Sequence, residues 1–218
     1  MITAVVDIDD TLIDTRRRMQ GIWHHVLNCR IPLQAIEDLN LRQIFEKYAS
    51  QDQKARTPEL RRRFFELLLC EDEVGIDLAE LDEPIPFAAE ALQAWSNHCI
   101  IVYLTGRPET TRDITMAELE KFGFPTENIQ MAMVDLEDWR TGAVTEARNS
   151  LLSSISQRHA IVRIVDDYPA YFTIYRQFDI TDRIGLLRSK RFSPQDFINH
   201  GATRVVESWK PLIEDLPK

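Results

Sequence analysis

Short apolar runs recur along the chain, and most are followed by a segment with helical spacing. The runs are "TAVVD" (3–7), "IIVYL" (100–104), "IQMAMV" (129–134) and "AIVRIV" (160–165), with a weaker one near "RIGLL". Runs of this length and composition are typical of strands buried on both faces of a sheet. Strands that alternate with helices form a parallel sheet with crossover connections. The sequence therefore predicts an α/β fold with a three-layer parallel-sheet core.

Residues 14–84 interrupt this alternation with a helical block. Apolar residues recur at helical spacing in three segments, near residues 19–27, 41–48 and 60–68. The acidic stretch 71–86 is rich in turn-forming residues and is predicted to be a connector. We therefore expect a core built from residues 1–13 and 85–218, with an all-helical insertion at 14–84.

Composition and charge narrow the classes of partner. The chain has 218 residues and a net charge of −9, which argues against non-specific nucleic-acid binding by the whole surface. No apolar run approaches the roughly 18 residues of a membrane span, and we expect neither a signal peptide nor a membrane partner. Three cysteines without a CxxC pair are consistent with reduced thiols. A cytoplasmic location is the expectation.

Polar residues gather where three of the predicted strands end. They are Asp7, Asp9 and Asp10 after the first run, Thr105, Gly106 and Arg107 after the second, and Asp166 and Asp167 after the fourth. Carboxyl ends of parallel strands share one edge of the sheet, and ligands bind there. Carboxylates crowded at that edge repel one another unless a cation lies among them. Oxygen ligands favour Mg²⁺ or Ca²⁺, and a site that also meets a phosphate favours Mg²⁺.

Some conspicuous residues have plainer explanations. Asp10 is expected to face solvent or a turn. Arg107 can either touch a substrate or pair with an acidic neighbour and stabilise its turn. The arginine runs 16–18 and 61–63 are expected to be solvated, and Trp23 and Trp95 are expected to be core residues.

The segments "VVDIDDTL", "IIVYLTGRPE" and "IVRIVDDY" resemble, in order, the first, second and fourth motifs of the haloacid dehalogenase-like superfamily. The resemblance covers roughly residues 1–13 and 85–190. The turn "LTGRPETTRDIT" is especially similar to that of acid phosphatases and polynucleotide-phosphatase domains of the superfamily. The helical insertion looks like the mobile cap that many members carry between the first two motifs.

The resemblance implies roles for the carboxylates. Asp7 would be the nucleophile that forms an aspartyl-phosphate. Asp9 would be the general acid and base, and its main-chain carbonyl would bind Mg²⁺. Asp7 and Asp166 would be the other Mg²⁺ ligands, with Asp167 assisting through water or hydrogen bonds.

The phosphate-binding residues follow from the second and third motifs. Thr105 would donate its hydroxyl and backbone N–H to phosphoryl oxygens, and Gly106 would allow close approach of the backbone. The third motif calls for a lysine, sometimes an arginine, but "TGAVTEARNSLLSSI" contains no lysine. Arg148 is the candidate, Arg140 is its rival, and neither need fill the position.

The resemblance favours a Mg²⁺-dependent phosphatase that hydrolyses a small-molecule phosphomonoester. Asp9 supports this class, because dehalogenases lack this metal-linked aspartate, phosphonate-cleaving members usually have a small residue there, and transport ATPases have threonine. One alternative is a phosphate- or phosphoprotein-binding regulator with a weakly catalytic site. Another is a 3′-phosphatase acting on nucleic-acid ends, which the acidic charge disfavours.

Overall fold

The structure, a computed structural model, describes residues 2–217 and divides into two compact units. The first, the α/β unit, runs to Ile13, continues from Pro84 to Arg188 and resumes at Phe192. The second, the helical unit, comprises Asp14–Glu83 and Ser189–Arg191. The chain passes between the units near β2 (Ile13–Asp14) and β3 (Glu83–Pro84), which form a two-stranded sheet.

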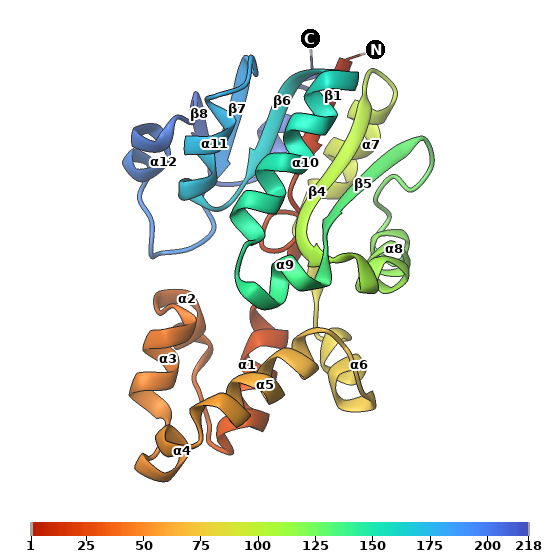
Figure 1. Ribbon diagram of the computed structural model, residues 1–218. Helices are drawn as coiled ribbons and strands as arrows, with labels where there is room; N and C mark the ends of the chain where they lie inside the picture. Colours follow the sequence, from red (N-terminus) through yellow and green to blue (C-terminus); the bar gives the residue numbers. More distant parts are fainter. Residues whose placement is uncertain (1, 218) are drawn as a thin grey trace. The chain divides into compact units, whose positions relative to one another are not determined.

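The α/β unit is built on a six-stranded sheet in which every pair of neighbouring strands is parallel (Figure 1). The spatial order is β5-β4-β1-β6-β7-β8. The strands are β1 (Ile2–Val6), β4 (Ile100–Pro108), β5 (Ile129–Val134), β6 (Ala160–Asp166), β7 (Asp182–Leu186) and β8 (Arg204–Val206). This sheet confirms the predicted α/β class and three-layer core.

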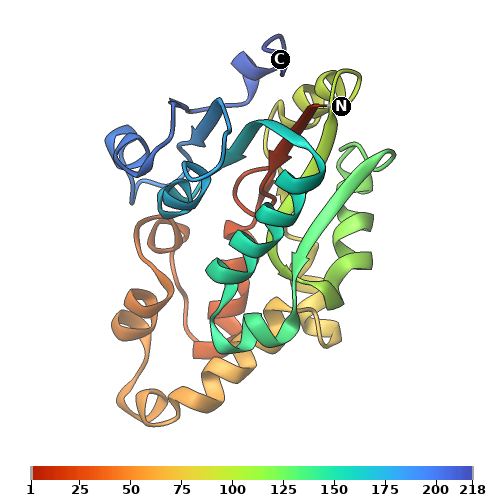
Figure 2. The same ribbon diagram turned by 45° about the horizontal axis from the view of Figure 1, so that its top comes forward.

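Helices cover both faces of the sheet because its central strands are apolar on both sides. On one face, Ala4 and Val6 pack with residues of α7 (Ala88–Ser96), α8 (Arg112–Lys121) and the 3₁₀ turn η3 (Lys210–Leu212). On the other face, Val5 packs with residues of α10 (Val144–Arg158), α11 (Phe172–Tyr175) and α12 (Pro194–His200). Helix α10 lies along the middle of that second face (Figure 2).

The remaining elements of the α/β unit are short. They are α9 (Leu136–Thr141) and the 3₁₀ turns η1 (Glu109–Thr111) and η2 (Pro169–Tyr171). No helix within residues 2–217 is long and apolar enough to span a bilayer.

The helical unit contains six helices and its own core. They are α1 (Arg16–Leu27), α2 (Leu33–Asp38), α3 (Leu41–Tyr48), α4 (Gln51–Ala55), α5 (Thr57–Leu68) and α6 (Glu73–Ala79). Its core includes Ile22, Trp23, Ile44, Phe64 and Leu67, all at positions where helical spacing places apolar residues. Capping boxes at Asn40 and Ser50 begin α3 and α4.

Some predicted details are wrong. The stretch 71–86 is not only a connector, because it contains α6. Residues 189–191 group with the helical unit and Pro84 groups with the α/β unit, one residue before the boundary expected at 84/85, and the division into core and cap stays a prediction. Arg18 is buried and pairs with Asp82 at 3.2 Å, so the run 16–18 is not wholly solvated. That the helical unit acts as a mobile cap stays a prediction.

Candidate active site

The order of the strands brings the three motifs to one edge of the sheet. Strand β1 lies between β4 and β6, and Val6 is in register with Tyr103 and Val165. Asp7 follows β1, Thr105 lies on β4 and Asp166 ends β6. Residues from three distant parts of the chain therefore meet at neighbouring strand ends.

The loop after β1 is held by main-chain hydrogen bonds. The Asp7 N–H donates to the Val165 carbonyl at 3.0 Å, which extends the pairing with β6 by one residue. The chain then turns at Asp10, which has a positive φ of 58° and donates its N–H to the Ile13 carbonyl. Aspartate tolerates this left-handed conformation better than most residues. Asp10 is therefore a turn residue, as predicted.

Three carboxylates form the acidic centre of this edge. Asp7, Asp166 and Asp167 each have an oxygen within 4.8 Å of the others, which suits a shared cation. Asp7 and Asp166 are buried. Burial, followed by the negative charge of Asp166, raises the pKa of Asp7 to about 7. Burial also raises the pKa of Asp166, and the positive charge of Arg148 offsets only part of that rise. Ionising the whole cluster thus costs free energy unless more positive charge is supplied.

Arg148 on α10 supplies positive charge to two of these carboxylates. Its Nη1 donates to Asp7 Oδ1 and its Nη2 to Asp166 Oδ2, both at 2.7 Å. The side chain is only 3% exposed. A planar guanidinium can bridge two carboxylates in this way, whereas an ammonium group offers no such fork. Through this contact, helix α10 on this face of the sheet restrains the Asp7 carboxylate.

Two tyrosines complete the surroundings of Arg148, and the sequence analysis did not identify either. Tyr175 receives a hydrogen bond from Arg148 Nη2 at 2.8 Å and donates one to Asp166 Oδ2 at 2.6 Å. The guanidinium carbon of Arg148 lies 4.3 Å from the centre of the Tyr171 ring. Aromatic residues five and nine positions after the acidic strand end at Asp166 were the available signal, but only the turn through η2 directs them back toward Asp166.

Asp9 is held by an arginine from the second motif. Arg107 Nη2 donates to Asp9 Oδ1 at 2.7 Å, and its Nε lies 3.0 Å from Asp9 Oδ2. Arg107 also pairs with Glu118 on α8 at 2.6 Å. Of the two roles expected for Arg107, the structure shows the pairing with acidic neighbours. Asp9 remains 37% exposed at its side chain, so it is the more accessible of the two motif aspartates.

Thr105 and Gly106 shape the turn after β4. Thr105 is fully buried, and its Oγ1 accepts a hydrogen bond from the Arg107 N–H at 3.1 Å. A Cβ placed on Gly106 would lie 3.3 Å from Val144 Cγ1, so the start of α10 limits the size of a residue here. Asp167 is positioned by Thr11, whose Oγ1 accepts from the Asp167 N–H at 3.1 Å.

Comparison with known proteins finds solved structures of similar fold. No protein-family model matches the chain, and no curated protein matches it. Solved structures do match, among them a phosphatase candidate from Clostridium difficile at 17% identity, with a TM-score of 0.72 over 98% of this chain and 97% of that one. A haloacid dehalogenase-like family hydrolase from Streptococcus pneumoniae matches at 14% identity and a TM-score of 0.66, over 97% and 96% of the two chains.

The chain has the fold of the haloacid dehalogenase-like hydrolases. A further member, a hydrolase from Deinococcus radiodurans solved with bound phosphate and sodium, matches at 16% identity and a TM-score of 0.58, over 96% and 92% of the two chains. The fold implied by the three motifs is thus confirmed.

Within this haloacid dehalogenase-like fold, the predicted charged residues of the site separate into three groups. Asp7, Arg148, Asp166 and Asp167 meet in one buried cluster. Asp9 and Arg107 form a neighbouring pair, and the negative charge of Asp9 contributes to the raised pKa of Asp7. Arg140, the rival of Arg148, is exposed on α9, and no ion pair is recorded for it within residues 2–217.

Proposed function

We propose that this protein is a Mg²⁺-dependent phosphatase that hydrolyses a small-molecule phosphomonoester through an aspartyl-phosphate on Asp7. The observation that carries this proposal is the cluster of Asp7, Asp166 and Asp167 around a single bridging arginine, Arg148. A carboxylate held at the end of a central strand, beside a cation-binding cluster, is suited to attack phosphorus.

The donor set fits Mg²⁺. Three carboxylate side chains lie within reach of one ion, and Arg148 neutralises only part of their combined charge. Asp7 and Asp166 would hold the ion together with the Asp9 carbonyl, and Asp167 would assist. When bound, the ion supplies charge stabilisation for the phosphoryl oxygens and lowers the cost of ionising the cluster.

The chain's own residues would carry the two steps. Asp7 attacks phosphorus, the bond between phosphorus and the leaving oxygen breaks, and Asp9 donates a proton to that oxygen. Asp9 then accepts a proton from the water that cleaves the aspartyl-phosphate, which releases phosphate and regenerates Asp7. Thr105 would donate to the phosphoryl oxygens, and Arg148 would keep Asp7 in place. Because both Asp9 oxygens face Arg107, this pair must open or shift during the cycle.

The phosphate found in the Deinococcus radiodurans structure of the same fold supports a phosphate-bearing ligand. The small-molecule class is favoured over nucleic acid by the net charge of −9. The motif resemblance and the enclosed position of Asp7 support the same proposal.

Hydrolysis of p-nitrophenyl phosphate with MgCl₂ tests the proposal. We expect Asp7→Asn to abolish turnover and Asp9→Asn to lower kcat by about a hundredfold or more, the size of a general-acid contribution. Asp10→Asn is a matched control, because asparagine also accepts the positive φ at this turn. Turnover by Asp7→Asn equal to that of wild type would contradict the assignment of the nucleophile.

A regulator that binds phosphate without turning it over is the second candidate. It is favoured by one observation: both motif aspartates are already paired, Asp7 with Arg148 and Asp9 with Arg107. Stabilisation by BeF₃⁻ with Mg²⁺ in a thermal-shift assay, without turnover across a broad panel of phosphate esters, would favour this candidate over the phosphatase.

A further inference from the structure

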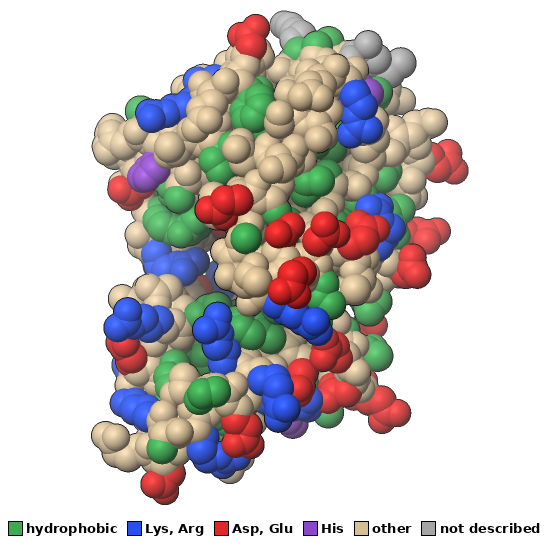
Figure 3. Space-filling model, viewed as in Figure 1, with side chains coloured by type: hydrophobic (Ala, Val, Ile, Leu, Met, Phe, Trp, Pro, Cys, Tyr) green, Lys and Arg blue, Asp and Glu red, His purple; other side chains and the backbone are tan. Residues whose placement is uncertain are grey.

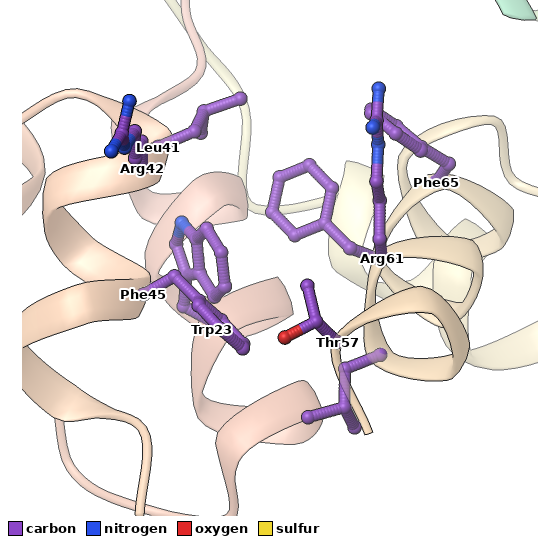
Figure 4. A pocket seen from close by; sticks show the side chains of 9 residues that line it. Trp23, Leu41, Arg42, Phe45, Thr57, Arg61 and Phe65 are labelled. Atoms are coloured by element: carbon purple, nitrogen blue, oxygen red, sulfur yellow. The ribbon is translucent and has the colours of Figure 1, made fainter. Parts of the chain in front are cut away.

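The helical unit contains a pocket of about 330 Å³ that belongs entirely to its own helices. The pocket is lined from α1, α3 and α5, chiefly by Trp23, Phe45, Phe64 and Phe65, with Arg42 and Arg61 among its polar side chains (Figure 4). Its size falls in the range of small-molecule sites, about 300–1,000 Å³. None of its lining residues comes from the candidate active site.

The walls of the pocket are aromatic. The Trp23 and Phe64 rings lie 4.6 Å apart between centroids, and Phe45 lies 6.4 Å from Trp23. Phe64 and Phe65 meet edge to face at 5.4 Å. Tilted and edge-to-face arrangements of this kind leave ring faces and edges that favour a further flat aromatic group.

One wall of the pocket has a buried donor without an acceptor. Trp23 is 5% exposed, and its Nε1 has no hydrogen-bond partner within the described chain. Figure 4 shows this nitrogen on the edge of the ring toward Leu41. By contrast, the buried indoles of Trp95 and Trp209 donate to the carbonyls of Leu212 and Thr11 at 2.9 and 2.8 Å. A buried N–H without an acceptor is costly, so an oxygen supplied by a ligand would be stabilised here.

Two arginine side chains, Arg42 and Arg61, bring positive charge to the pocket. Arg61 lies with its guanidinium carbon 5.5 Å from the centre of the Phe65 ring, and no ion pair is recorded for it among residues 2–217. Arg42 pairs with Glu46 at 2.7 Å and is largely exposed. On the face shown in Figure 3, Lys and Arg side chains lie around hydrophobic surface over the helical unit. An anionic group on the ligand is thus favoured over a neutral or cationic one.

We propose that this pocket binds a small planar aromatic carboxylate. The ring packs against Trp23, Phe45 and Phe64, and a carboxylate oxygen accepts from Trp23 Nε1 on the Leu41 side of the pocket. Arg61, on the other side of the pocket beside Phe65, adds positive charge without contacting the carboxylate. This site is separate from the phosphate site in its lining residues, so its occupation does not require Asp7.

Titration of the ¹⁵N-labelled protein with 2-naphthoate tests the proposal. The Trp23 indole N–H resonance, identified by its absence in Trp23→Phe, is expected to move downfield and saturate as it gains an acceptor. The indole resonances of Trp95 and Trp209 serve as internal references, because both already donate to carbonyls. Asp7→Asn is expected to bind 2-naphthoate as wild type does, which separates this proposal from the phosphatase proposal.

Charge recognition is tested with a matched pair of arginines. Arg61→Gln is expected to weaken binding about twofold, because Arg61 is exposed and lies across the pocket from the carboxylate. Arg62→Gln is the control, because Arg62 is exposed, pairs with Glu66 and does not line the pocket. Methyl 2-naphthoate, which keeps the ring but loses the charge, should bind wild type about fivefold more weakly than the acid.

Three results would overturn the proposal. The first is a Trp23 resonance that does not respond to 2-naphthoate. The second is equal affinity for the acid and its methyl ester. The third is a Trp23 resonance that shifts with protein concentration when no ligand is present, because a second copy of the chain would then cover the pocket.

Discussion

At the scale of single residues, the carboxylates of the acidic cluster outnumber the one arginine, Arg148, that neutralises them. Arg148 contacts both Asp7 and Asp166, and its guanidinium is almost completely buried. Removing one partner from a buried ionic cluster leaves the others uncompensated, which costs more than the net contribution of the cluster itself. Arg148 is thus expected to affect both stability and metal binding.

We expect Arg148→Ala to lower the free energy of unfolding by about 3 kcal/mol at pH 8 in EDTA, because two buried carboxylates lose their cation. Urea denaturation measures this loss, and MgCl₂ should restore part of it. Arg140→Ala, on the exposed surface of α9, should stay within about 0.5 kcal/mol of wild type. Equal losses in the two variants would contradict the role given to Arg148.

The pKa of Asp7 predicts a dependence of stability on pH. It rises from 3.8 to about 7 on folding, so between these values the native state binds more protons than the unfolded state. Stability from this group therefore falls as pH rises from about 4 to 7, and the cost is fully present above pH 7.

Asp7→Asn removes that cost, because asparagine does not ionise. In EDTA, the variant is expected to gain stability relative to wild type between pH 4 and pH 8, on the order of 1–3 kcal/mol at the upper end. Thermal unfolding of both proteins across this range measures the difference. A difference that stays constant with pH would show that Asp7 does not titrate there.

At the scale of elements, the sheet brings the site residues together at one edge, and the surrounding helices add further contacts. Buried runs with strand composition predicted β1, β4, β5 and β6 because a strand buried on both faces has a strong apolar signal. Three elements did not carry such a signal: β8 has three half-buried residues, α9 has no buried residue, and α6 exposes Val74 and Ile76. Whether an element with little apolar burial forms depends on tertiary contacts and on capping hydrogen bonds.

Helix α6 illustrates this. Asp72 caps it by accepting from the Gly75 N–H at 2.8 Å, and Gly75 packs so closely on α5 that an added Cβ would lie 2.7 Å from the Leu67 carbonyl oxygen. The glycine that looks like a turn signal in the sequence is required by close packing of two helices.

We expect Gly75→Ala to destabilise the protein by about 1–3 kcal/mol, because backbone atoms rather than a flexible side chain would have to move. Urea denaturation measures the change. Val74→Ala, at a position 36% exposed, should change stability by less than about 0.5 kcal/mol. A neutral Gly75→Ala would show that α5 and α6 separate more easily than the structure implies.

At the scale of the whole molecule, the chain forms two units with separate cores. The helical unit has its own buried ion pair, Arg18 with Asp82, and both side chains are at most 7% exposed. This pair joins the start of α1 to the last residues before β3. It therefore ties together the two ends of the helical insertion.

We expect Asp82→Ala to destabilise the helical unit by about 3 kcal/mol, because Arg18 loses a buried partner. The Trp23 indole resonance should report an earlier unfolding transition, while those of Trp95 and Trp209 report the α/β unit. Glu83→Ala is the control, because its pair with Arg17 is exposed and 3.9 Å long. An equal shift at Trp23, Trp95 and Trp209 would show that the two units unfold together.

The sequence by itself determined the fold class and the positions of the acidic motifs along the chain, and it predicted a helical insertion in the α/β core. Those features depend on local patterns: apolar runs of strand length, helical spacing and polar residues directly after a strand. It also indicated Arg148 as one of two arginines for the third motif, but helix phase alone left that choice open.

Only the tertiary structure decided which side chains meet. It joined Arg148 to Asp7 and Asp166, turned Tyr175 back onto Asp166 and paired Asp9 with Arg107. It likewise buried Arg18 within an arginine run that looks solvated. These contacts link residues up to 141 positions apart, and such distant pairings depend on strand order and helix packing, which no local pattern encodes.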